Sequence, residues 1–190
     1  MSDNNCWYKL KISVENALKP DWKLPTTEEP LLTWQYQATD MFNTNWISTM
    51  RDIGLEPISG LVFYRNYTGL ETCAHIDGNG ADRKPVFALN WVIGGANSTL
   101  IWYKLPDYDA SPRFTKIQTP YQAWLRKDLE EIDRVHIGSH LTLVRIDKPH
   151  AVEMGTEPRW CISVRTKLPE PSSWEEILEI LREKQLLIET

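Results

Sequence analysis

The sequence lacks the features that define several specialised classes of protein. It has three cysteines in 190 residues, far apart and with no C-x-x-C pair. An odd, scattered set fits neither a disulfide framework nor a zinc ribbon. We therefore expect Cys6, Cys73 and Cys161 to be free thiols in a reducing compartment.

Long apolar runs and blocks of basic charge are missing as well. No stretch approaches the ~20 apolar residues of a membrane helix, and the first residues do not place an apolar run after a basic segment, as a secretory signal does. The net charge is −5 and Lys and Arg do not cluster, which argues against nucleic-acid binding but leaves a local basic groove open. These absences predict a cytoplasmic protein without a membrane partner; a monomer and a homodimer are both open.

Large aromatic residues, in contrast, are abundant, with nine Trp among 190 residues. Such rings fill wide cores and line pockets, and we assign most of them to the core. A chain of this length predicts one domain, residues 1–190, with a substantial core. Its zones are an N-terminal support region at 1–56, a β-barrel core at 57–168 and a C-terminal helix at 172–188.

The middle zone has the pattern of several short strands. Its segments are rich in β-branched and aromatic residues and are separated by Gly, Asn and Ser. Strands at this spacing indicate a sandwich or a barrel, so we expect a mostly β fold with flanking helices. Gly138 and Ser139, between two of the segments, predict a tight hairpin. The clearest segments are LVFYRNY (61–67), VFALNWVI (86–93), TLIWYKL (99–105), HLTLVRI (140–146) and RWCISVRT (159–166).

Segments with helical spacing flank the strands. Apolar residues near a period of 3.6 predict a helix at 39–54, ended by Gly54. Near the C-terminus, Ser173 can cap a helix and Glu176 follows three residues later, as in a capping box. We expect this helix to pack on the strands through one apolar stripe. Its members are Trp174, Ile177, Leu178 and Leu181.

Two histidines and one aspartate form a candidate metal site. His75 and Asp77 are two residues apart in an extended segment, so their side chains point to the same side. His150 follows Pro149 at the end of the segment LTLVRI, where the chain leaves the sheet and a side chain can face a cavity. Two His and one carboxylate on one face suit Fe(II) and leave coordination positions open.

An arginine follows these residues. Arg159 opens the segment RWCISVRT, nine residues after His150, and alternate residues of such a strand would be buried. A buried guanidinium is costly unless it meets an anion, and its parallel donors match a carboxylate. A dicarboxylate cosubstrate, a structural Arg–Glu pair and an exposed strand end are all open at this point.

The pattern His75-x-Asp77, then His150, then Arg159 in R-W-C-I-S-V resembles the Fe(II)/2-oxoglutarate oxygenase superfamily. It is most similar to the prolyl-hydroxylase branch, including the oxygen-sensing prolyl hydroxylases, in which an Arg-aromatic-small-Ile-Thr/Ser-Val segment follows the distal His. The compact form also looks like short stand-alone members from bacteria and phages. The resemblance covers about Leu61 to Lys167.

The resemblance implies a double-stranded β-helix, a jelly-roll or cupin-like barrel. It implies Fe(II) held by His75, Asp77 and His150, and Arg159 on the distal carboxylate of 2-oxoglutarate. Arg165 is the second choice for that role, or a contact for an anionic substrate. The implied activity is O₂-dependent hydroxylation of a C–H bond in a prolyl or other peptide or protein side chain, or in a small molecule, with decarboxylation of 2-oxoglutarate to succinate. Further candidates for the pocket are Tyr64, Asn90 and Trp91.

Several other interpretations stay open. A cupin-like metal-binding protein or sensor would keep the barrel and the metal without 2-oxoglutarate, and a non-enzymatic binding domain could use the same scaffold. His136 and His140 have no obvious third ligand, so we expect them to be surface imidazoles. The stretch 103–124, which contains three prolines, could be a lid or a substrate loop.

Overall fold

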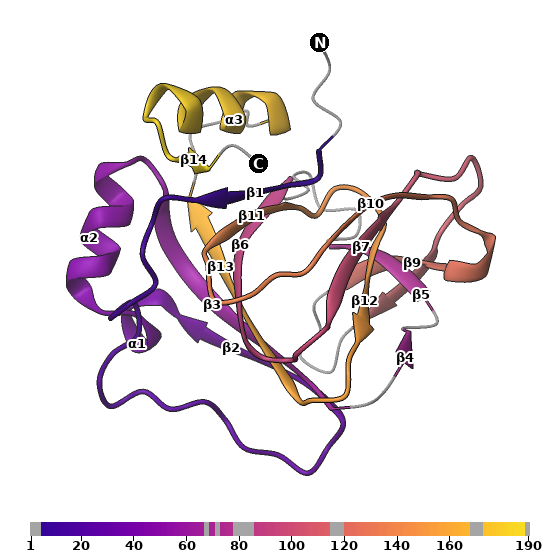
Figure 1. The fold of residues 1–190 in the computed structure, drawn as a ribbon, viewed down its shortest axis with the longest axis horizontal. Coiled ribbons are helices and arrows are strands. Elements are labelled where there is room, and N and C mark those ends of the chain that lie inside the picture. Colours follow the sequence, from indigo (N-terminus) through magenta and orange to yellow (C-terminus); the bar gives the residue numbers. More distant parts are fainter. Residues whose placement is uncertain are drawn as a thin grey trace.

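The chain folds mainly as β-strands in two antiparallel sheets, with three α-helices in the described residues. Figure 1 shows how these elements are arranged. The computed structural model describes residues 5–66, 69–70, 73–77, 86–114, 120–167 and 173–188. The mostly β fold with flanking helices is confirmed. Across these ranges, none of the helices has the length and apolar character that a membrane crossing requires.

The first sheet is built around its longest strands. Its members are β1 (Trp7–Leu10), β2 (Leu31–Gln37), β3 (Glu56–Arg65), β6 (Phe87–Gly94), β11 (Thr142–Arg145), β13 (Arg159–Lys167) and β14 (Leu187–Ile188). They lie in the order β14-β1-β11-β6-β13-β3-β2. β13 is central, so Arg159 lies opposite Arg65 of β3 on one side and Gly94 of β6 on the other.

The second sheet is made of shorter strands. Its members are β4 (Gly69–Leu70), β5 (Cys73–Asp77), β7 (Thr99–Tyr103), β8 (Ser111–Phe114), β9 (Pro120–Leu125), β10 (Glu131–Val135) and β12 (His150–Met154). Their order is β10-β7-β12-β5-β9-β8, with β4 beside β12. A short 3₁₀ turn (Arg126–Asp128) follows β9. The stretch predicted as a lid thus supplies β8 and β9 to this sheet, apart from 115–119, which lie outside the described residues.

The two sheets share one apolar layer. Trp102 of β7 is fully buried there, and its indole Nε1 donates a hydrogen bond to the carbonyl of Arg145 in β11 at 2.8 Å. This contact ties the second sheet to the first, because the two residues belong to different sheets. The layer includes Ala88, Val92 and Val144 from the first sheet and Leu100, Trp102 and Val152 from the second.

The two N-terminal helices cover the other face of the first sheet. α1 (Ala38–Met41) and α2 (Thr44–Asp52) replace the single helix predicted at 39–54. That prediction was wrong because Asn43 is extended, at ψ 138°, and its side chain caps α2 by accepting from the Asn45 amide at 2.9 Å. Gly54 lies beyond the helix end at φ +82°, as expected of a stop.

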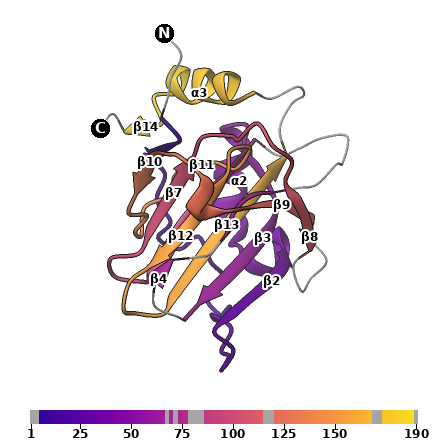
Figure 2. The same cartoon turned by 90° about the vertical axis from the view of Figure 1, so that its right-hand side faces the viewer.

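The C-terminal helix α3 (Trp174–Glu183) lies across one end of the first sheet, next to β14 (Figures 1 and 2). Both hydrogen bonds of the capping box are present, between Ser173 and Glu176, and the four residues of the apolar stripe are buried. Both predictions are confirmed. The helix is shorter than predicted, because the chain turns after Glu183 and adds β14 to the sheet beside β1.

The prediction of a hairpin at Gly138 and Ser139 was wrong. β10 pairs with β7 in the second sheet, whereas β11 pairs with β1 and β6 in the first, so the segment between them crosses from one sheet to the other. The carbonyl of Gly138 accepts a hydrogen bond from the Val92 amide at 2.8 Å. Gly138 also lacks the positive φ found at Gly54, Gly94 and Gly95, and two-residue hairpin turns require it.

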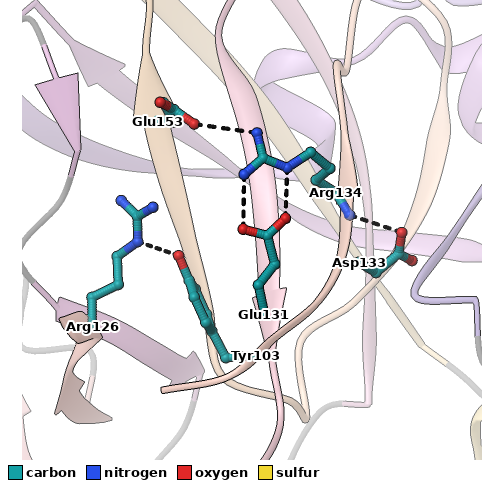
Figure 3. A network of polar contacts seen from close by, with 6 residues as sticks. All are labelled: Tyr103, Arg126, Glu131, Asp133, Arg134 and Glu153. Carbon is teal, nitrogen blue, oxygen red and sulfur yellow. Dashed lines mark hydrogen bonds and ion pairs between the residues drawn. The ribbon is translucent and has the colours of Figure 1, made fainter. Parts of the chain in front are cut away.

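A network of polar contacts covers the outer face of the second sheet (Figure 3). Arg134 of β10 donates to both carboxylate oxygens of Glu131, at 2.6 and 2.7 Å, and its Nη1 lies 3.6 Å from Glu153 of β12. Arg126 donates to the hydroxyl of Tyr103. Exposed pairs of this kind contribute at most about 1 kcal/mol each. The network therefore adds only weak contacts around the edge strand β10, and none of its residues lines the cavity between the sheets.

Candidate metal centre

Strand pairing brings His75, Asp77 and His150 together. His75 and Asp77 lie two residues apart on β5, so both point to the same face. His150 of β12 lies directly opposite His75, with ring centroids 4.4 Å apart. One ligand atom of each residue lies within 4.8 Å of the others, a group that could bind a metal ion.

Backbone contacts select the tautomer of His150 that can ligate. Its Nδ1 lies 2.9 Å from the carbonyl oxygen of Lys148. A carbonyl only accepts, so Nδ1 carries the proton and the neutral ring has its lone pair on Nε2. Metal-bound histidines are commonly oriented by such a second hydrogen bond. His150 is only 7% exposed, so the surrounding protein also restricts the orientation of its ring.

Arg165 of β13 holds the carboxylate of Asp77. Its Nη2 donates to Oδ2 at 2.6 Å, while Oδ1 lies 3.6 Å from Nε2 of His75. Burial alone would raise the pKa of Asp77, but the charge of Arg165, followed by His150 and His75, outweighs it and holds that pKa well below its usual range. The carboxylate is therefore ionised at neutral pH, which is the form that binds a cation.

These residues line a cavity of about 40 Å³ whose walls come from both sheets. Its charged lining adds Arg65 of β3 and Arg159 of β13 to Asp77 and Arg165. Asn90 of β6 also reaches it, and within the described residues the side-chain oxygen Oδ1 of Asn90 is buried without a hydrogen-bond partner. The cavity has room for about three water-sized groups by volume, and its polar atoms are arranged for a charged or polar ligand.

Arg159 and Arg165 face the cavity together, as their spacing of six residues predicts for a strand. Arg159 is only 3% exposed, so it is a buried arginine and not an exposed strand end. Arg165 is bound to Asp77, which places its guanidinium beside the candidate metal ligands. The partners of this ion pair are 88 residues apart in the chain, so no local sequence pattern predicted it.

Tyr64 and Trp91 do not reach the cavity. Tyr64 stacks on Trp160, with centroids 4.9 Å apart, and Trp91 packs against Phe42 and Trp46 on the helix side of the sheet. Both expectations therefore need correction: side chains alternate along a strand, and these two occupy the wrong face. Their neighbours line the cavity instead, namely Phe63 and Arg65 on β3 and Asn90 on β6. Side chains alternate along β3, so a strand that buries Tyr64 on the helix side turns Phe63 and Arg65 to the cavity.

The remaining histidines, His136 and His140, lie outside the cavity lining. His136 and His140 are exposed, and His136 Nδ1 lies 2.7 Å from the carbonyl of Ser98. All three cysteines are free thiols, as predicted. Burial raises the pKa of Cys6 to about 12, so this thiol is inert at neutral pH, whereas Cys161 lines the cavity.

No protein-family model matches this chain, and neither a curated protein nor a solved structure matches it. Its function is therefore inferred from the candidate metal centre and the cavity beside it.

Proposed function

We propose that this chain is a non-haem Fe(II)- and 2-oxoglutarate-dependent dioxygenase that hydroxylates a C–H bond. The observation that carries the proposal is the group of His75, Asp77 and His150 in a cavity also lined by buried Arg159. Two His and one carboxylate on one face favour Fe(II) and leave positions for a cosubstrate and O₂. A buried guanidinium nearby matches the distal carboxylate of 2-oxoglutarate.

The strand order supports a double-stranded β-helix. The eight central strands, in chain order, are β3, β5, β6, β7, β10, β11, β12 and β13. The first pairs with the eighth, the second with the seventh, the third with the sixth and the fourth with the fifth. A long hairpin that is rolled up into two sheets has this pairing, and jelly-roll folds are built in this way. The strand pairing therefore supports the fold that the resemblance implies.

The residues present fit the proposed metal and cosubstrate. His75, Asp77 and His150 would hold Fe(II), and Arg159 would bind the distal carboxylate of 2-oxoglutarate. Nη1 of Arg165 and Oδ1 of Asn90 are buried polar atoms that lack a hydrogen-bond partner within the described residues, so a polar ligand would satisfy them. Fe(II), 2-oxoglutarate and O₂ together supply an oxidant for the C–H bond, with loss of CO₂ and formation of succinate.

The protein's own contribution is orientation. The backbone carbonyl of Lys148 orients the ring of His150, and the guanidinium of Arg165 orients the carboxylate of Asp77. These two candidate ligands are therefore held in place before a metal binds. The intact carboxylate of Asp77 argues for hydroxylation and against halogenation, for which that position must admit a halide. The resemblance to prolyl hydroxylases favours a prolyl or other peptide or protein side chain as the substrate.

The test is succinate formation from 2-oxoglutarate with Fe(II) and O₂, screened against pools of peptides, amino acids and nucleic acids. Wild type should form succinate, at least in uncoupled turnover, and His75→Ala should not. His140→Ala is the matched control, because His140 is exposed. Absence of succinate in every pool, together with unchanged metal binding in His75→Ala, would refute the proposal.

A cupin-like metal-binding protein or sensor without 2-oxoglutarate chemistry is the second candidate. The group of His75, Asp77 and His150 is the observation behind it, because these three side chains could hold a metal without any cosubstrate. A thermal-shift titration separates the two, since a ligand that binds only the native state raises its stability. With Mn(II) present, 2-oxoglutarate should stabilise wild type and fail to stabilise Arg159→Ala under the first candidate; it should stabilise neither under the second.

A further inference from the structure

The hairpin of β8 and β9 extends the second sheet beyond the candidate metal ligands. β9 pairs with β5, and β8, the edge strand at the right in Figure 2, pairs with β9. Directly opposed residues of antiparallel strands have their side chains on the same face. Tyr121 lies opposite Asp77, and Arg113 lies opposite Tyr121. These three residues therefore form a row that leads from the candidate metal centre to the edge of the sheet.

A ring contact confirms the face on which Tyr121 lies. Its ring meets the ring of His75 edge-on, with centroids 5.7 Å apart and an interplanar angle of 76°. The opposite face of the hairpin is packed, since Trp124 is buried there and its indole Nε1 donates to the carbonyl of Tyr108 at 3.2 Å. One face of the hairpin is thus covered, and the other continues the surface that carries His75 and Asp77.

The face with Tyr121 is open to solvent. Arg113 is exposed and Tyr121 is partly buried, and Leu125, on the same face opposite Cys73, is 50% exposed. The lining of the cavity between the sheets includes Asp77 but neither Tyr121 nor Arg113. This face is therefore a separate surface next to the cavity, which a ligand can reach from solvent.

Arg113 sets the charge at the outer end of the row. At the inner end, the charge of Asp77 is balanced by Arg165 at 2.6 Å. A guanidinium has parallel donors that match a carboxylate. Because the whole chain carries a net charge of −5, an exposed arginine beside the candidate metal centre gives an approaching anion a local place to bind.

We propose that this face of β8 and β9 is the recognition surface for the substrate, and that Arg113 binds a carboxylate of that substrate. The inference rests on the proposed function and names the substrate class. Neighbouring strands lie about 4.8 Å apart, so the two strand spacings from β5 to β8 put the carboxylate within about 10 Å of the reacting C–H bond. Tyr121 lies between these two ends and supports the intervening part of the substrate. The carboxylate comes from an acidic side chain of a peptide or from the α-carboxylate of a free amino acid.

The test measures succinate formation by Fe(II)-loaded protein, with 2-oxoglutarate and O₂, in matched pools of probes. Capped tetrapeptides that contain Glu are compared with the same peptides containing Gln, and free amino acids are compared with their amides. The first pair of pools tests a side-chain carboxylate and the second tests the α-carboxylate. At least one carboxylate pool should raise the rate above that without a probe. Its neutral counterpart should be about fivefold less effective, the factor that an exposed ion pair supports.

Three variants test whether Arg113 causes this preference. Arg113→Gln should lose the preference for the carboxylate pool, whereas Arg113→Lys keeps the positive charge and should retain most of it. Arg51→Gln is the control for loss of an exposed arginine, because the Arg51 side chain is 59% exposed and lies on α2. It should behave as wild type. Melting temperatures check that each variant is folded.

The outcomes separate the recognition surface from the proposed function. A carboxylate preference that is lost in Arg113→Gln and kept in Arg113→Lys supports the recognition surface. Equal rates with both members of each pair, no stimulation by any pool, or a preference that persists in Arg113→Gln overturns it. In these cases the succinate formed without a probe leaves the proposed function standing. Wild type that forms no succinate under any condition overturns both.

Discussion

Breaking the ion pair between Asp77 and Arg165 should destabilise the metal-free protein by about 2 kcal/mol. A hydrogen bond to a charged group contributes about 1.5–3 kcal/mol. The side chains are 20% and 17% exposed and the donor–acceptor distance is 2.6 Å, so solvent screens the pair only weakly. Breaking a fully buried pair costs about 3–5 kcal/mol, and this pair should lie below that range because its groups keep some contact with water.

The assay is urea unfolding at pH 7 in the presence of a chelator, for wild type, Asp77→Asn, Arg165→Met and the double variant. The two single variants should each lose stability, and the double variant should lose less than their sum. The coupling energy from this cycle isolates the pair from the other effects of each substitution. A parallel cycle on Arg51 and Glu56, 2.9 Å apart but 59% and 39% exposed, is the control and should give about 0.5 kcal/mol.

A coupling energy for Asp77 and Arg165 no larger than that of the control pair would refute the reasoning. It would mean that the guanidinium of Arg165 does not hold the carboxylate of Asp77 in solution. The proposal that Arg165 orients Asp77 for metal binding would then be wrong as well. The metal supplies a second readout. Arg165→Met keeps all three ligand residues, so Mn(II) should still stabilise it, whereas Asp77→Asn should lose most of that stabilisation.

Three further predictions concern the fold. Because the pKa of Asp77 is below its unfolded value of about 3.9, its contribution to stability is complete above that pH and is lost as pH falls through the folded pKa; urea midpoints measured from pH 7 to pH 2 should fall less steeply in Asp77→Asn. Gly155→Ala should destabilise by more than about 2 kcal/mol, since its Cβ would lie 2.0 Å from a backbone carbonyl oxygen of the β6–β7 turn, whereas Gly138→Ala, with its nearest atom at 4.0 Å, should melt close to wild type. Ser173→Ala removes the cap that Glu176 completes and should cost about 1 kcal/mol in chemical denaturation.

The strands, and the two candidate metal ligands His75 and Asp77, could be predicted from the sequence because their signals are local. Alternating β-branched and aromatic residues mark strands wherever they pair, and the His75-x-Asp77 spacing alone puts two candidate ligands on one face. Pairing partners could not be predicted in the same way. The segments before and after Gly138 look like a hairpin, yet β10 and β11 belong to different sheets. Asn43 was the local signal for the break between α1 and α2, since Asn is a strong N-cap residue.

The pocket residues show how a shift of one residue changes a functional assignment. Side chains alternate along a strand, so an error of one position moves a residue to the opposite face. Tyr64 was chosen on β3, but Phe63 and Arg65 face the cavity. On β6 the adjacent candidates Asn90 and Trp91 could not both be right, and Asn90 is the one in the cavity.

The inward face of β13 supports the interpretation of the cavity as a binding site. Its Trp160, Ile162 and Val164 face the helices, as an amphipathic strand predicts for its apolar side. The usual rule would then turn the other side to water. Here that side faces the interior between the sheets and carries Arg159, Cys161, Ser163 and Arg165. Three of these four residues are polar, and they line the cavity together with His75, Asp77 and His150. Buried polar side chains gathered around one cavity are typical of places where proteins bind ligands and react.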